Sequence, residues 1–395
     1  MNQFNQTMMQ SVTGYTQVTD GQALAELCRH WQQRPFLAFD TEFIRTNTFY
    51  PKMALIQVCD GSANFLIDPL SIGQWEEFKA LIINPEVTKV FHSCSEDLLV
   101  FLSFLGVVPS PVFDTQIASA LLNEGFGLSY QNLVRQKTGL ELPKGETRSD
   151  WLQRPLTPEQ LDYAALDVAY LPEIYQLLQA LLEKQGKSDW MREEGERLTH
   201  GCDAEIKADF SDYYLNFKNA WQLNRVQLAA LQKLVIWREE KARKRDRPKS
   251  WIIDDQQVFA IARNRPETLQ QLSAIAGLSP KFLKHEGEAL LQLLQAVAGM
   301  PESALPALTR QPLSAGQKKK LKAAQSYIEE KAAVLTMAPE LLARKKTLLA
   351  LLYSCLDAKA RLGTIPDSEQ ITIPEDLQGW RRPVIVADLL AIFAA

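Results

Sequence analysis

The sequence contains little that would support zinc or disulfide chemistry. Its five cysteines are scattered along 395 residues, at positions 28, 59, 94, 202 and 355, and form no C-x-x-C pair. Only four histidines are present, and none belongs to an H-E-x-x-H segment. Disulfide frameworks, structural zinc sites and zinc hydrolase chemistry are therefore disfavoured. We expect the cysteines to be mostly small buried residues in a reducing compartment.

Long apolar runs and an excess of basic residues are also missing. No run approaches the roughly 20 apolar residues of a membrane-spanning helix, and the first residues lack the basic and apolar regions of a signal peptide. We therefore expect a cytoplasmic monomer without membrane contacts. The net charge of −4 argues against a polycation that coats nucleic acid, but it leaves room for a localised basic track.

The first part of the chain has the pattern of an α/β domain. Strand-like runs occur at 35–40, 53–59, 63–68, 88–92 and 111–114, and helical stretches at 72–83, 95–105 and 115–123. Asp60-Gly61 separates the second and third runs, which predicts antiparallel pairing there. The later strands alternate with helices, which predicts parallel crossovers and hence a mixed sheet.

A long stretch at 124–156 has no clear pattern and is expected to be irregular. It precedes a helix whose start is well marked, since Thr157, Pro158 and Gln160 form a capping-box signature. After about residue 200 the strand signals nearly vanish, and two small all-α domains are expected. We therefore predict an α/β domain over 1–205 and helical domains over 206–298 and 299–395.

Acidic residues recur at three places in the α/β part. Asp40-Thr41-Glu42 ends the apolar run 36–39, and side-chain alternation along a strand points both carboxylates to one side. Asp97 follows the strand at 88–92, and Tyr163 and Asp167 lie four residues apart on a predicted helix. Each match alone also fits a solvated strand end or helix face. Together they predict a site for two hard divalent cations, Mg²⁺ or Mn²⁺.

Such a site has a defined chemistry. Two cations roughly 3.5–4 Å apart can hold an attacking water and a leaving oxygen in line across a phosphodiester. Tyr163, with an ordinary pKa near 10, is a poor general base at neutral pH and is better suited to orienting the water by a hydrogen bond. For Asp114, at the junction of a strand and a helix, a helix N-cap is preferred over metal binding.

Several segments in combination resemble one known family. The DEDD 3′→5′ exonucleases of the tyrosine subclass, and most closely the ribonuclease D family, share the pattern found here. The matching segments are Asp40-Thr41-Glu42-Phe43, His92-Ser93-x-Ser95-Glu96-Asp97-Leu98, Tyr163-x-x-x-Asp167, Asp114-Thr115-Gln116, Arg148-Ser149-Asp150-Trp151-x-x-Arg154-Pro155-Leu156 and Asn219-Ala220-Trp221-x-Leu223.

The resemblance covers nearly the whole chain and implies a ribonuclease H-like fold followed by helical domains of the type shared by helicases and ribonuclease D (HRDC). It implies that Asp40, Glu42, Asp97 and Asp167 bind metal and that Tyr163 positions the water. It further implies an exoribonuclease that releases nucleoside 5′-monophosphates from RNA with a single-stranded 3′ end, such as tRNA precursors. A DNA 3′→5′ exonuclease and a non-catalytic RNA-binding scaffold remain as alternatives.

Candidate RNA contacts lie in two regions. His92 and the loop residues Lys144, Arg148 and Arg154 could meet substrate, although a structural histidine and solvated loop charges are equally compatible with the sequence. The most basic segment, 238–249, is flanked by Trp237 and Trp251. The candidates there are Arg243, Lys244, Arg245 and Arg247. The alternative for this segment is a helix with Glu–Lys pairs and tryptophans in the core.

Overall fold

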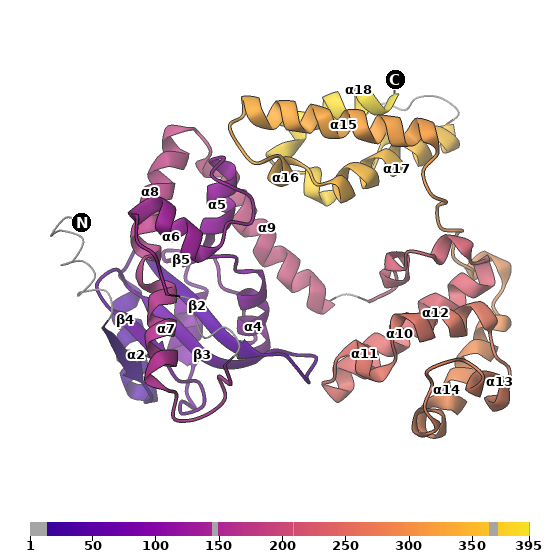
Figure 1. The fold of residues 1–395 in the computed structure, drawn as a ribbon, viewed down its shortest axis with the longest axis horizontal. Coiled ribbons are helices and arrows are strands. Elements are labelled where there is room, and N and C mark those ends of the chain that lie inside the picture. Colours follow the sequence, from indigo (N-terminus) through magenta and orange to yellow (C-terminus); the bar gives the residue numbers. More distant parts are fainter. Residues whose placement is uncertain (1–13, 144–148, 208, 363–369, 395) are drawn as a thin grey trace. The chain divides into compact units, whose positions relative to one another are not determined.

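The computed structural model describes residues 14–143, 149–207, 209–362 and 370–394 (Figure 1). The chain forms two compact units. The first combines residues 14–44, 52–203 and 314–394, and the second combines 45–51 with 204–313. The helices after residue 314 thus belong with the α/β part, whereas the sequence analysis set 299–395 apart. The boundaries at 205/206 and 298/299 stay predictions.

A six-stranded mixed sheet organises the first unit. Its strands are β1 (Tyr15–Val18), β2 (Phe36–Ile44), β3 (Lys52–Cys59), β4 (Asn64–Ile67), β5 (Thr88–Phe91) and β6 (Val112–Asp114), in the spatial order β1-β4-β3-β2-β5-β6. The pairs β2–β3 and β3–β4 are antiparallel, whereas β2–β5, β5–β6 and β1–β4 are parallel. The predicted mixed α/β sheet is therefore confirmed.

Local chemistry explains the hairpin between β3 and β4. Gly61 has φ +85°, a conformation that glycine adopts without steric cost. The Asp60 carboxylate accepts hydrogen bonds from the backbone N–H groups of Ser62 and Ala63 at 2.8 and 2.9 Å. The strand that sequence reasoning missed is β1, an edge strand of four residues with only Val18 buried, too short and polar to show a pattern.

Helices cover both faces of the sheet (Figure 1). The helices of this part of the chain are α2 (Gly21–Trp31), α3 (Glu76–Ile82), α4 (Ser95–Leu105), α5 (Thr115–Leu121), α6 (Tyr130–Thr138), α7 (Pro158–Ala169), α8 (Leu171–Lys184) and α9 (Ser188–Lys207). Within the described residues, α6 corrects the expectation of an irregular stretch over 124–156. Its only buried residues are Leu133 and Val134, so it carries almost no apolar periodicity.

The two sheet faces have different cores. Phe39 packs with Trp31, Phe78 and Phe91 against the helices on one face. On the other face, α7 packs against β2, β3 and β4 over a core that includes Leu55. Because side chains alternate along β2, the neighbours of Phe39 point toward α7. Asp40 is therefore placed on the α7 face by the same alternation that buries Phe39.

The second unit is helical. It contains α10 (Arg225–Arg245), α11 (Lys249–Ile252), α12 (Asp255–Asn264), α13 (Leu269–Ser273), α14 (Pro280–Ala298) and the 3₁₀ turns η1 (Tyr213–Asn216), η2 (Ala220–Gln222) and η3 (Glu302–Ala304). Its core includes Leu228, Leu231 and Leu290. Of the described residues, no helix combines the length and hydropathy that a membrane span requires.

The C-terminal helices pack on the α/β part of the first unit. They are α15 (Ala315–Val334), α16 (Pro339–Leu342), α17 (Lys345–Leu362), the short turns η5 (Glu375–Leu377) and η6 (Arg382–Val386), and α18 (Ala387–Ala394). The backbone N–H of Ala338 donates to the carbonyl oxygen of Ala120 at 2.8 Å. Lys187 Nζ donates to the carbonyl oxygens of Leu121 at 2.7 Å and Thr336 at 3.0 Å.

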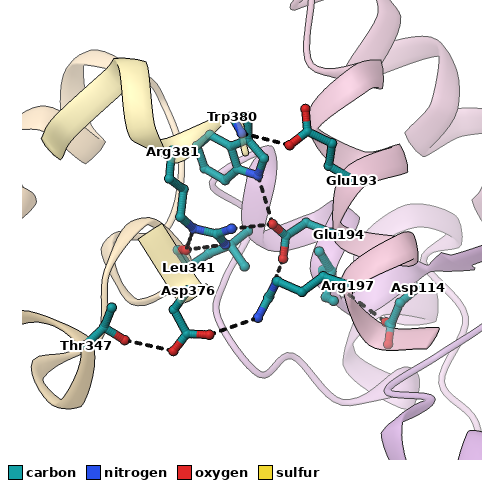
Figure 2. A network of polar contacts seen from close by, with 10 residues as sticks. Asp114, Glu193, Glu194, Arg197, Leu341, Thr347, Asp376, Trp380 and Arg381 are labelled. Atoms are coloured by element: carbon teal, nitrogen blue, oxygen red, sulfur yellow. Dashed lines mark hydrogen bonds and ion pairs between the residues drawn. The ribbon is translucent and has the colours of Figure 1, made fainter. Parts of the chain in front are cut away.

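A buried ionic network fastens these helices to α9 (Figure 2). Glu194, 1% exposed, accepts hydrogen bonds from Arg381, from Arg197 and from the indole N–H of Trp380, the last at 2.8 Å. The rings of Trp190 and Trp380 stack with centroids 4.4 Å apart. Burial raises the pKa of Glu194, but the two arginines outweigh it and hold the pKa below its ordinary value.

We predict that Glu194→Ala destabilises the protein by about 3–5 kcal/mol, because it leaves the Arg381 guanidinium buried without its counter-charge. The stabilisation from a depressed carboxyl pKa is present above the unfolded value and is lost as the pH falls through the folded value. The free energy of unfolding of the wild type should therefore fall by this contribution below about pH 4.5. The variant has no such contribution, so its free energy of unfolding should not show this decrease. Urea unfolding at several pH values measures both effects.

Glu196 on the same helix provides the matched control. It pairs with Arg192 at 2.7 Å, and both side chains are more than half exposed. Since exposed ion pairs contribute about 0–1 kcal/mol, Glu196→Ala should change stability little. Equal losses in the two variants would contradict the assignment of Glu194 as the anchor.

Candidate active site

The end of β2 presents the first carboxylates. Asp40 lies directly opposite Gln57 of β3, and Glu42 lies opposite Leu55, so all four residues share the α7 face. Gln57 is fully buried, and among the described residues neither of its amide atoms has a hydrogen-bond partner. A buried unsatisfied amide is costly, which marks Gln57 as part of the site that sequence reasoning missed. Only knowledge of the strand register could have identified it.

Asp97 is brought to the same place by a helix N-terminus. Thr41, between the two β2 carboxylates, faces the opposite way and donates its hydroxyl hydrogen to Asp97 at the start of α4. Asp114 is the N-cap of α5, as predicted, and accepts from the backbone N–H of Gln116 at 2.8 Å. It also accepts from the backbone N–H groups of Ser93 and Cys94 at 3.0 and 2.9 Å. One carboxylate thereby fixes the turn that leads into α4.

Helix α7 supplies the remaining pair. The capping box predicted at Thr157 and Gln160 is present, and it fixes where the helix begins. Tyr163 and Asp167 then fall one turn apart, and their side chains are hydrogen-bonded to each other. The helix buries Ala164 and Ala165 completely. Small residues at these positions let α7 lie close against the sheet.

Electrostatics tie the four carboxylates into one group. Burial raises the pKa of Asp40 well above its ordinary value, and the charges of Asp97, Asp167 and Glu42 raise it further. Burial, together with Asp167 and Asp97, raises the pKa of Glu42 to about 9. Burial also raises the pKa of Asp97 and of Asp167, each to about 7. Ionising all four groups together in this position is therefore costly.

These residues fit divalent cations. Hard ions such as Mg²⁺ take oxygen ligands, and they are usually held by one or two carboxylates with waters and substrate phosphates completing the shell. In keeping with that, no three His, Cys, Asp or Glu side chains of the described residues already converge on a single cation position. Which of the four carboxylates bind a cation therefore stays a prediction.

A cavity of about 210 Å³ opens beside this group. Its lining comprises Phe39, Asp40, His92, Tyr130, Gln131, Tyr163, Asp167 and Leu171. Tyr130 and Gln131 come from α6, so sequence reasoning missed them together with that helix. The Tyr130 hydroxyl donates to the carbonyl oxygen of Leu166 at 3.1 Å, and its burial near Asp167 raises its pKa. The lining thus includes the tyrosines Tyr130 and Tyr163 and two of the carboxylates, Asp40 and Asp167.

His92 lines the cavity, but both of its ring nitrogens form hydrogen bonds within the protein. Nε2 lies 2.9 Å from the carbonyl oxygen of Leu128, and Nδ1 lies 2.9 Å from Oγ1 of Thr115. Because a carbonyl only accepts, Nε2 carries the hydrogen. Burial lowers the pKa of His92, which favours the neutral ring. These bonds give it the structural role left open by the sequence, and its contact with substrate stays a prediction.

Arg154 differs from its predicted role. Its guanidinium donates to both Asp68 oxygens and to the carbonyl oxygens of Trp151, Gln153 and Ala54, each at 2.7 or 2.8 Å. All five N–H groups are therefore used internally, and none remains for a phosphate. Arg154 anchors the segment before α7 to the sheet. The other two loop candidates, Lys144 and Arg148, lie outside the described residues.

Two arginines of the basic segment 238–249 also have partners within the second unit. Arg245 pairs with Glu286, and Arg243 lies over the rings of Phe49 and Phe210 at 4.8 and 4.7 Å. These contacts give both arginines partners inside the second unit, and their contact with RNA stays a prediction.

Two other members of the segment are more open. Arg247 donates to the carbonyl oxygen of Asn47 at 3.2 Å and lies 5.8 Å from the ring of Trp251. Trp251 is 61% exposed, which corrects the core alternative for this tryptophan, whereas Trp237 packs at the edge of the core. Lys244 is exposed. Lys244 and Trp251 thus face solvent, and their contact with RNA stays a prediction.

Comparison with known proteins agrees with both units. A family model described as 3′-5′ exonuclease matches residues 15–183, and the model of the HRDC domain matches residues 227–294. Among solved structures, the catalytic core of RRP6 from Trypanosoma brucei aligns with a TM-score of 0.54 at 23% identity, over 74% of this chain and 81% of that one. This last likeness shows the fold alone.

Closer relatives share the whole architecture. Ribonuclease D of Pseudomonas paraeruginosa is 40% identical over 92% of this chain and 94% of its own length. Ribonuclease D of Escherichia coli is 37% identical over 93% of this chain and 95% of its own. The crystal structure of Escherichia coli RNase D, described as an exoribonuclease involved in structured RNA processing, aligns with a TM-score of 0.86 at 34% identity, covering 96% of this chain and 98% of that one. The chain therefore belongs to the ribonuclease D family.

Proposed function

We propose that this 3′→5′ exoribonuclease hydrolyses RNA at the cavity beside Asp40, with Asp40, Glu42, Asp97 and Asp167 as metal ligands and Tyr163 as the group that orients water. The observation that carries the proposal is electrostatic. Four carboxylates from β2, α4 and α7 influence one another strongly enough to raise the pKa of Asp40 well above its ordinary value. Perturbed carboxyl groups that line a cavity are typical of functional sites.

The reaction is phosphodiester hydrolysis at the 3′ end. A water oxygen bonds to the terminal phosphorus, the bond from phosphorus to the upstream 3′ oxygen breaks, and that oxygen takes a proton. The products are a nucleoside 5′-monophosphate and an RNA one nucleotide shorter. Two bound divalent ions, Mg²⁺ or Mn²⁺, would supply Lewis-acid activation of the water and stabilisation of the leaving oxygen.

Tyr163 is suited to hold the water rather than to deprotonate it. Burial and the nearby carboxylates Asp167, Glu42 and Asp40 raise its pKa above the ordinary value, so the phenol stays neutral at physiological pH. Its hydrogen is directed to Asp167, which leaves the phenolic oxygen free to accept a hydrogen bond from the attacking water. Asp167 thereby fixes the direction in which Tyr163 presents its lone pairs.

We assign structured RNA with a single-stranded 3′ end as the substrate class, with tRNA precursors as the leading example. The Escherichia coli relative, an exoribonuclease involved in structured RNA processing, supports the assignment to structured RNA. The HRDC unit supports it further, because Lys244 and Trp251 expose a cation and an aromatic ring, the groups that bind single-stranded nucleic acid by charge and stacking. The chain retains all five expected groups, Asp40, Glu42, Asp97, Tyr163 and Asp167, which disfavours the non-catalytic scaffold.

The decisive measurement is Mn²⁺-dependent release of mononucleotides from matched RNA and DNA oligomers. We predict release from RNA, and a loss of at least about 100-fold in single-turnover rate for Asp40→Asn, Glu42→Gln, Asp97→Asn or Asp167→Asn, since each amide removes charge from the metal site. Thermal unfolding of each variant shows whether folding is intact. A near wild-type rate in one variant would remove that residue from the ligand set, and equal release from DNA would favour the DNA exonuclease.

Metal-free stability should depend on pH in a defined direction. A carboxyl whose folded pKa is raised stabilises the protein below its unfolded value, and this contribution is lost as the pH rises through the folded value. For Asp97 and Asp167, the pH range over which this contribution is lost runs from about pH 4 to about pH 7 and somewhat above. In EDTA, melting temperature should therefore fall from pH 5 to pH 8, and the fall should be smaller in Asp167→Asn. Added Mn²⁺ should raise the wild-type value at pH 8 more than that of the variant.

Tyr163→Phe should slow cleavage by roughly 10- to 100-fold with little loss of RNA affinity, because it removes one hydrogen bond to the water. Single-turnover rates with Mn²⁺ and binding with Ca²⁺, measured on the same oligomer, separate the two effects. Wild-type cleavage accompanied by weakened binding would instead make Tyr163 a substrate contact.

A further inference from the structure

An exposed aromatic residue stands close to the active-site cavity. Phe126 lies in the loop between α5 and α6, is 44% exposed, and sits between Gly125 with φ +136° and Gly127 with φ +66°. Both glycines adopt backbone conformations that other residues rarely reach. The loop is therefore specialised to hold an apolar ring in solvent, a position that core packing does not explain.

The loop is bonded to the wall of the cavity. Two residues beyond Phe126, the carbonyl oxygen of Leu128 accepts hydrogen bonds from His92 Nε2 at 2.9 Å and from Gln116 Nε2 at 3.0 Å. His92 lines the cavity together with Asp40. Two residues span at most about 7 Å of chain, so Phe126 lies near the cavity wall that His92 forms.

Three consecutive cations accompany this ring. Arg344, Lys345 and Lys346 are all exposed, and the Arg344 guanidinium lies 5.4 Å from the centre of the Phe126 ring. The hydrogen bond between Ala338 and Ala120 holds the start of α16 beside α5. Within the described residues, no carboxylate forms an ion pair with any of the three cations.

Helix stability does not account for these charges. Lys345 and Lys346 occupy the first turn of α17, and no acidic residue is present there. The positive end of the helix dipole disfavours cations at that position. The cluster therefore raises local positive potential at some cost to the helix, and an anionic partner would offset that cost.

We propose that Phe126, Arg344, Lys345 and Lys346 form a platform for single-stranded RNA, two or more nucleotides upstream of the scissile phosphate. A base stacks on the Phe126 ring, and backbone phosphates meet the three cations. The inference rests on the proposed function, because the same strand must end in the cavity beside Asp40. An exposed aromatic ring beside three cations matches single-stranded nucleic acid better than an acidic peptide, which offers no stacking faces.

The test measures binding of an adenylate octanucleotide to the full chain in Ca²⁺, so that it does not depend on catalysis. Phe126→Ala should weaken binding on the order of tenfold, as expected for one lost base stack. The triple change Arg344→Gln, Lys345→Gln, Lys346→Gln should weaken binding and reduce the slope of log affinity against log salt by up to about 2.

Matched controls lie on the same unit. Ile83→Ala removes a side chain that is 50% exposed, and Lys318→Gln, Lys319→Gln, Lys322→Gln removes three exposed cations of α15. Both controls should bind like the wild type. Phe126→Trp should retain affinity, because it keeps a stacking surface. Thermal unfolding verifies that each variant is folded.

Dinucleotide hydrolysis with Mn²⁺ separates this proposal from the proposed function. The platform variants should hydrolyse a dinucleotide at the wild-type rate, since that substrate does not reach the platform. Wild-type octanucleotide affinity in both Phe126→Ala and the triple variant would overturn the platform while leaving the active site intact. Absence of hydrolysis in the wild type would overturn the proposed function, and the Ca²⁺ binding data would still decide the platform.

Discussion

The first unit must hold four carboxylates close together although they repel one another. Asp40 and Glu42 share one face of β2, Asp97 reaches them through Thr41, and Asp167 comes from α7. Bringing these groups together raises their pKa values, so the folded protein without cations carries an electrostatic cost. In the proposed function this cost favours the binding of divalent ions, because the same charges that repel one another attract metal.

Holding the carboxylates in place requires anchors whose polar groups are fully used. Asp114 accepts four hydrogen bonds from backbone N–H groups and so joins the start of α4 to the start of α5. All five N–H groups of Arg154 donate to Asp68 and to three carbonyl oxygens. These bonds fix the segment that precedes α7. Both residues are charged and resemble substrate ligands in the sequence. Their geometry shows that they stabilise the positions of other residues.

The first unit is assembled from segments far apart in the chain. The C-terminal helices join α5 and α9 through Lys187, the stacked pair Trp190–Trp380 and the buried pair Glu194–Arg381 (Figure 2). Gly195 allows α9 to approach β6 closely, since a Cβ there would lie 2.2 Å from the carbonyl oxygen of Val112. Through this packing, the chain after residue 314 contributes Arg344 to the surroundings of Phe126. The helices at the end of the sequence thus belong structurally with its beginning.

The sequence by itself determined what depends on local pattern. Alternation along β2 placed Asp40 and Glu42 on one side, Asp60-Gly61 predicted the hairpin, and the Thr157–Gln160 capping box set where α7 begins. Tyr163 and Asp167 followed from helical spacing. These features rest on interactions over a few residues, which short patterns encode.

Tertiary structure alone decided the features that join distant residues. Polar α6 buries only Leu133 and Val134 and is joined to α7 by the hydrogen bond from the Tyr130 hydroxyl to the carbonyl oxygen of Leu166. Gln57 entered the site through strand register, and Arg154 became an anchor because Asp68 lies across the fold. The same holds for Arg243, held between Phe49 and Phe210. A charged side chain looks alike in sequence whether it meets RNA or a partner in its own chain, and only the folded arrangement of those partners distinguishes the two.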